Sequence, residues 1–102
     1  MRVSVIDTVG PAIRRLRRAR RLNQTSFAER AGIEKSLMSK IEVGAVKATI
    51  EHIFRAAMAL EVLPSKIMLE AESLAGDVNS RDFSFLSPKE RDKVIKEILE
   101  DR

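Results

Sequence analysis

With 102 residues and 44% hydrophobic content, the chain has enough apolar material for one core of ordinary size. No apolar run approaches the roughly 20 residues of a membrane span, and the N-terminus lacks the long apolar core of a secretion signal. The absence of cysteine excludes a disulfide framework and a thiolate metal site. We therefore expect one soluble domain with a tail, located in the cytoplasm.

The net charge of +4 is divided unevenly along the chain. Residues 1–49 contain eleven Arg or Lys against four Asp or Glu, a net +7, whereas residues 50–102 contain eight against eleven, a net −3. A polyanion-binding protein needs its positive charge on one surface, because each neutralised phosphate releases condensed counterions. The asymmetry therefore indicates nucleic acid as a partner of the N-terminal half.

Residues 1–10 alternate loosely between apolar and polar types, which predicts an N-terminal arm or a short strand. Pro11 is suited to the first position of a helix, where no backbone N–H is needed, so a helix is predicted from about Pro11 to Arg21 with Ile13 and Leu16 inward. Its arginines either contact phosphate or solvate an outer face; they are Arg14, Arg15, Arg17, Arg18, Arg20 and Arg21.

Residues 23–44 predict two short helices joined by a glycine turn, the unit that seats one helix in a DNA major groove. Asn23 is a good N-cap for a helix from about Gln24 to Ala31, in which Phe27, Ala28 and Ala31 share one face. Gly32 follows where the chain leaves that helix, a position suited to a left-handed backbone.

The second short helix is predicted from about Lys35 to Glu42, with Met38 and Ile41 buried at a spacing of three. Its exposed face is short, polar and basic, and consists of Lys35, Ser36, Ser39 and Lys40.

The order of residues in and around this motif resembles the helix-turn-helix domain of the phage Cro and CI repressors and their bacterial relatives. The residues that carry the resemblance are Arg17, Gln24, Phe27, Ala28, Gly32, Met38, Ile41, Glu42, Gly44, Ile53 and Leu60. It covers roughly residues 13–68 and implies an all-α, five-helix lambda-repressor-like domain that binds operator DNA as a dimer. Departures that soften helix ends or loops stand at Glu34, Ala48, Glu61 and Leu63.

The resemblance also implies roles for individual residues. Arg17 is expected to form a partly buried structural salt bridge with Glu42. The expected DNA-binding residues are Asn23, Gln24, Lys35, Ser36, Leu37, Ser39, Lys40 and Lys47. Asn23 and Gln24 either cap their helix only or also contact phosphate. Lysine suits guanine O6 and N7, serine is nearly indifferent, and Leu37 either touches a thymine methyl group or is tolerated at the surface.

The remaining chain predicts three more helices. Thr49 can cap the fourth, whose apolar stripe is expected to be Ile50, Ile53, Phe54, Ala57 and Leu60. Pro64 starts a fifth helix that continues to about Leu74. The domain is thus expected to span residues 11–75, followed by a linker at 76–87 and a last helix at 88–102. Ser87, Pro88 and Glu90 have the capping-box spacing for that helix.

The last helix carries Val94, Ile95, Ile98 and Leu99 on one side, where it can pack on its own domain or on a partner subunit. We favour dimerisation, because doubling the footprint raises specificity. His52 is the lone histidine, so no metal site, cofactor or enzymatic activity is expected. The sequence predicts a transcriptional repressor or autoregulator that binds a near-palindromic operator as a homodimer. The alternatives are an antitoxin-type autorepressor that grips a toxin with its C-terminal segment, and a protein–protein interaction module without DNA binding.

Overall fold

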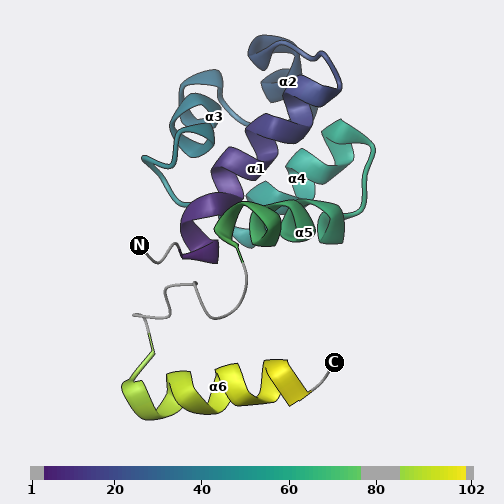
Figure 1. Ribbon diagram of the computed structural model, residues 1–102. Coiled ribbons are helices and arrows are strands. Elements are labelled where there is room, and N and C mark those ends of the chain that lie inside the picture. Colours follow the sequence, from purple (N-terminus) through teal and green to yellow (C-terminus); the bar gives the residue numbers. More distant parts are fainter. Residues whose placement is uncertain (1–3, 77–85, 101–102) are drawn as a thin grey trace.

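The computed structural model describes residues 4–76 and 86–100, and this part of the chain contains six helices and no strand (Figure 1). They are α1 (Val5–Ala19), α2 (Gln24–Ala31), α3 (Lys35–Glu42), α4 (Ile50–Leu60), α5 (Pro64–Ala75) and α6 (Pro88–Glu100). The first five pack together, with α1 lying mainly against α5 and also against α3 and α4. The predicted all-α class is confirmed. No helix in the described ranges is long and apolar enough to cross a bilayer.

The predicted start of the first helix is wrong, because α1 begins at Val5 and contains Pro11 in its interior. Ser4 caps it by accepting a hydrogen bond from the Ile6 backbone N–H at 3.2 Å. The Thr8 hydroxyl is buried and donates to the Ala71 carbonyl of α5 at 2.8 Å. Residues 4–10 are therefore packed into the domain and do not form a strand or a free arm, since tertiary packing outweighs the local preference of Gly and Pro.

Gly10 explains why the helix continues through this point. A Cβ atom at residue 10 would collide with the backbone carbonyl of Ile41 in α3. Glycine at this position lets α1 and α3 approach backbone to backbone, and the glycine acts as a helix-crossing residue in place of the predicted turn residue.

The core lies between α1, α2, α3 and the inner faces of α4 and α5. Its largest fully buried apolar side chains are Phe27, Ile13, Met38, Ile41, Leu60 and Ile67. The α4 stripe differs from the prediction. Ala56, Ala57, Ala59 and Leu60 face the core, whereas Ile50 is 73% exposed and Phe54 is 59% exposed. Apolar residues surround more than half of α4, so periodicity alone does not identify its inner face.

The predicted helix caps are confirmed where the sequence offers a suitable side chain. Asn23 accepts from the Ser26 N–H, Thr49 forms a capping box with His52, and Ser87 caps α6. Glu34 and Leu63 precede α3 and α5 without a side-chain cap, as expected for softened helix ends. Of the predicted linker and termini, residues 1–3, 77–85 and 101–102 lie outside the described ranges.

Candidate nucleic-acid interface

The angle between α2 and α3 is set by a tight turn and a shared core. Gly32 adopts φ +67°, and the following Ile33 donates its backbone N–H to the Ala28 carbonyl at 3.0 Å. Ala28 is almost fully buried, so its small side chain allows the two helices to cross closely. With Met38 and Ile41 fully buried, one face of α3 is fixed inward and the opposite face is presented to solvent.

The solvent face of α3 is formed by the residues that the sequence predicts. Lys35, Ser36, Ser39 and Lys40 are exposed, and Lys47 is exposed in the loop before α4. The Ser36 hydroxyl donates to the Glu34 carboxylate at 2.8 Å, so this serine already has an acceptor in the free protein. Leu37 is half-buried and packs against the core, which leaves only part of its side chain for a ligand.

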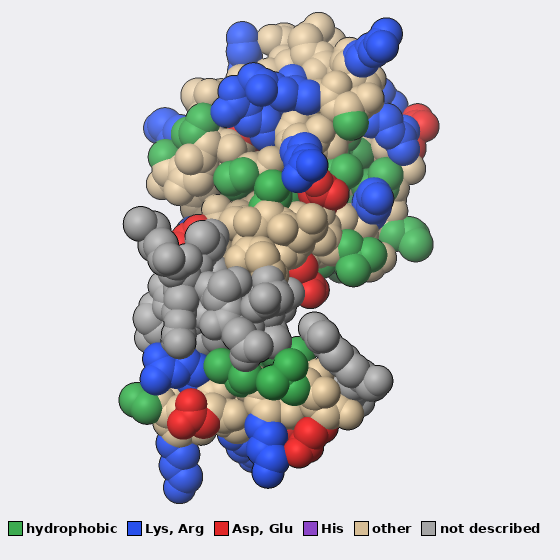
Figure 2. Space-filling model, in the orientation of Figure 1, with side chains coloured by type: hydrophobic (Ala, Val, Ile, Leu, Met, Phe, Trp, Pro, Cys, Tyr) green, Lys and Arg blue, Asp and Glu red, His purple; other side chains and the backbone are tan. Residues whose placement is uncertain are grey.

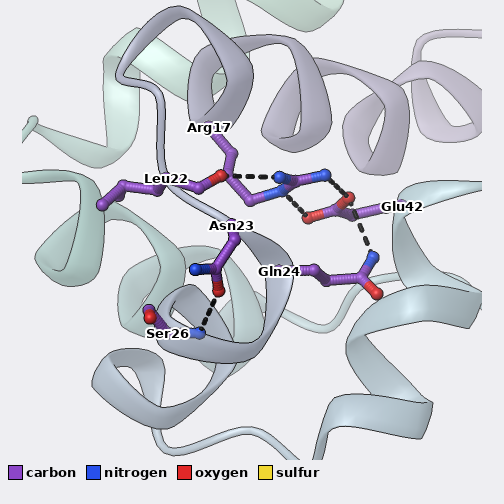
Figure 3. Close-up of polar contacts among 6 residues, drawn as sticks. All are labelled: Arg17, Leu22, Asn23, Gln24, Ser26 and Glu42. Carbon is purple, nitrogen blue, oxygen red and sulfur yellow. Dashed lines mark hydrogen bonds and ion pairs between the residues drawn. The ribbon is translucent and has the colours of Figure 1, made fainter.

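A buried ion pair anchors the other end of α3 (Figure 3). Arg17 of α1 donates from Nε and Nη2 to the two carboxylate oxygens of Glu42 at 2.8 and 2.9 Å. Their side chains are 10% and 1% exposed. Two parallel N–H···O bonds fix the relative position of both groups, which a single contact between flexible charges does not achieve. The pair therefore holds α3 against α1.

Two further contacts extend this pair into a cluster of Arg17, Leu22, Gln24 and Glu42, referred to below as the Arg17 cluster. Arg17 Nη1 donates to the Leu22 carbonyl in the α1–α2 connection at 2.7 Å. Gln24 Nε2 donates to Glu42 Oε1 at 3.1 Å, while its amide oxygen points away from the pair (Figure 3). One buried cluster thus joins α1, the start of α2 and the end of α3, and fixes the orientation of the exposed α3 face.

Positive charge surrounds this region. Figure 2 shows Lys and Arg side chains gathered over the part of the molecule that α1, α2 and α3 form in Figure 1. Arg14, Arg15 and Arg18 line a groove of about 400 Å³ beside the end of α3. Arg15 is partly neutralised by Glu70 of α5 at 3.1 Å. A basic surface next to a polar, exposed helix face is the arrangement that polyanion binding requires.

Comparison with known proteins agrees with this geometry. A family model described as helix-turn-helix matches residues 13–67. The chain belongs to this helix-turn-helix family. A solved structure of the restriction-modification controller protein C.AhdI from Aeromonas hydrophila superimposes with a TM-score of 0.58 and 27% sequence identity. The match covers 61% of this chain and 94% of the controller protein. No curated protein matches the chain significantly.

The family and the structural neighbour identify a DNA-binding transcriptional regulator, and the predicted helix-turn-helix is confirmed. Sequence reasoning missed one residue of the interface, Gly10, which seats α1 against the end of α3. Its signal was present as the spacing of Gly10, Ile13 and Arg17 along one helical face, but the adjacent proline suggested a helix start in its place.

Proposed function

We propose that the chain is a sequence-specific transcriptional repressor or autoregulator that binds a near-palindromic operator as a homodimer. One observation carries this proposal: α3 exposes Lys35, Ser36, Ser39 and Lys40 on a helix whose far end is locked by the buried Arg17–Glu42 pair. A basic helix face held rigidly on the surface can enter a major groove without first being ordered.

The residues of this face have distinct roles in the proposal. Lys35 and Lys40 donate to guanine O6 and N7, and Ser39 makes an adaptable hydrogen bond to a neighbouring base. Ser36 exchanges its Glu34 acceptor for a base or phosphate when DNA is present. Leu37 offers its exposed part to a thymine methyl group.

Phosphate contacts come from the surrounding elements. Asn23 and Gln24 stand at the N-terminus of α2, where free backbone N–H groups and the helix dipole favour an anion. Lys47 approaches the backbone from the α3–α4 loop, and the groove with Arg14 and Arg18 adds positive charge on the opposite flank. These groups supply affinity that depends on salt and position α3 without reading sequence.

A homodimer follows from the size of the reading element. One α3 of eight residues contacts only a few base pairs, and a twofold pair of such helices on half-sites about 34 Å apart gives the footprint that specific regulation needs.

The experiment is a fluorescence-anisotropy titration of a duplex taken from just upstream of the protein's own coding sequence, alongside a shuffled duplex. We expect Lys40→Ala to weaken binding to the upstream duplex by about 5- to 150-fold, which corresponds to about 1–3 kcal/mol, and to affect the shuffled duplex less. Lys66→Ala is the matched control, since Lys66 is an equally exposed lysine on α5.

Equal losses on both duplexes would move Lys40 from base reading to phosphate contact. An unchanged affinity of wild-type protein for the upstream and shuffled duplexes would reject sequence-specific regulation at that site. A complete absence of DNA binding would favour a protein–protein interaction module.

A further inference from the structure

An apolar stripe runs along the outer face of α4. Ile50, Phe54 and Met58 are 73%, 59% and 60% exposed, and their spacing of four places each one turn above the last. Leu63 and Leu69, 74% and 63% exposed, add apolar surface before and on the adjacent α5. In a five-helix domain of this size, so many large exposed apolar side chains mark a surface that another element covers. The α4 stripe is defined here as Ile50, Phe54 and Met58.

A second uncovered apolar face lies on α6. Val94, Ile95, Ile98 and Leu99 fall on one side of this helix, and Figure 2 shows hydrophobic side chains gathered along that side. No residue of α6 is buried, and the helix lies apart from the five-helix bundle (Figure 1). An isolated helix of 13 residues is marginal in water, so α6 needs a packing partner to persist.

The two faces match in length and chemistry. α4 has 11 residues and α6 has 13, which correspond to about 16 and 20 Å of helix. Both present aliphatic or aromatic side chains at helical spacing along most of that length. α6 also lies beyond residues 13–67 that the helix-turn-helix family model matches, so it is an addition to the DNA-binding unit.

We propose that each α6 packs its apolar face along the α4 stripe of a second copy of the chain, so that the two subunits exchange tails reciprocally. The inference rests on the homodimer of the proposed function and names its interface. Seven side chains at roughly 100 Å² each give about 700 Å² per contact. Two reciprocal contacts bury about 1,400 Å², within the range of stable protein interfaces, whereas one contact falls below it.

Chemical crosslinking tests this arrangement directly, because the chain has no native cysteine. Full-length Phe54→Cys and Ile98→Cys proteins, carrying different tags, are mixed without DNA and treated with a short bismaleimide. We expect a crosslinked heterodimer as the main product, at least tenfold above the yield from Phe54→Cys mixed with Lys96→Cys. Lys96 is the matched control because it lies on the opposite, charged side of α6.

Three outcomes would overturn the proposal. Phe54→Cys that crosslinks to itself as efficiently as to Ile98→Cys would show α4 packing on α4. A Phe54→Cys/Ile98→Cys double variant linked mainly within one chain would show the tail docking on its own domain. No crosslinking above the Lys96→Cys control would show that α6 does not reach the stripe.

Sedimentation of full-length Ile98→Asp and Phe54→Asp gives an independent readout. Both substitutions replace side chains that are not buried, so the five-helix core and its melting transition should remain. We expect each to raise the dimer dissociation constant at least tenfold, and a dissociation constant equal to wild type for either would contradict the exchange. Since neither assay contains DNA, their failure leaves the DNA-binding proposal standing, and a failure of operator binding leaves the crosslinking result intact.

Discussion

Removal of Arg17 should destabilise the whole domain, because it would strand a charge in the interior. The Glu42 carboxylate is 1% exposed and takes two hydrogen bonds from Arg17 and one from Gln24. In Arg17→Ala only the amide donor of Gln24 remains among these, and no positive charge balances the carboxylate. Breaking a buried pair in this way costs about 3–5 kcal/mol. That is a large part of the 5–15 kcal/mol that typically stabilises a domain.

The magnitude translates into a large thermal shift. For a domain of this length, each kcal/mol lowers the melting temperature by about 4–8 °C, so Arg17→Ala and Glu42→Ala should each lose about 15 °C or more. Thermal melts followed by circular dichroism measure the loss, and urea titration covers variants that melt too early. Arg17→Lys should lie between wild type and Arg17→Ala, since lysine keeps the charge but not the bidentate geometry.

Arg30→Ala is the matched control for this series. Arg30 pairs with Glu61 at 3.2 Å, but the two side chains are 46% and 70% exposed, so its loss should cost less than about 1 kcal/mol. A double-mutant cycle then isolates the pair: Arg17→Met/Glu42→Leu should lose clearly less than the sum of the single losses. Single variants that melt like Arg30→Ala would refute the anchoring role of the Arg17 cluster.

Three further variants test separate features of the fold. Gly10→Ala should lower stability by about 1–3 kcal/mol despite its better helix propensity, because the new Cβ meets the Ile41 carbonyl; a raised melting temperature would contradict the close crossing. Glu61→Gly should raise stability by up to about 1 kcal/mol, since Glu61 has φ +57° at the end of α4, whereas Glu61→Ala should bring no gain. The pKa of Glu90 is lowered by its hydrogen bonds with Ser87, so the cap of α6 stabilises the helix above the ordinary titration range of the carboxyl and weakens as the pH falls through it. Ser87→Ala should return this pKa toward its ordinary value in a titration followed by NMR, and an unchanged value would exclude the hydrogen bonds as its cause.

The helix-turn-helix was predictable because its signals are local and redundant. Asn23 caps α2, Gly32 ends it at positive φ, and Phe27, Met38 and Ile41 follow a 3.6-residue period that no strand or loop shares. Caps, turn and core face all specify the same two helices. The exposed face of α3 follows directly, since it is what remains after the buried face is assigned.

The features that sequence reasoning missed depend on contacts between distant segments. Gly10 followed by Pro11 favours a helix start locally, and only the approach of the Ile41 carbonyl from α3 shows why a helix passes through both residues. On α4, Ile50 and Phe54 are as hydrophobic as the residues that face inward. Which side is buried is decided by the alanines, which let α4 pack closely on its neighbours. Local pattern carries no information about such neighbours.

Methylation interference on the upstream DNA examines most directly whether the exposed face of α3 reads operator sequence. Methyl groups at guanine N7 lie in the major groove, where Lys35 and Lys40 are proposed to donate, and methyl groups at adenine N3 lie in the minor groove. We predict two clusters of interfering guanines about one helical turn apart, and loss of interference at individual guanines with Lys40→Ala. Interference confined to adenine N3, or spread evenly along the duplex, would contradict recognition through α3.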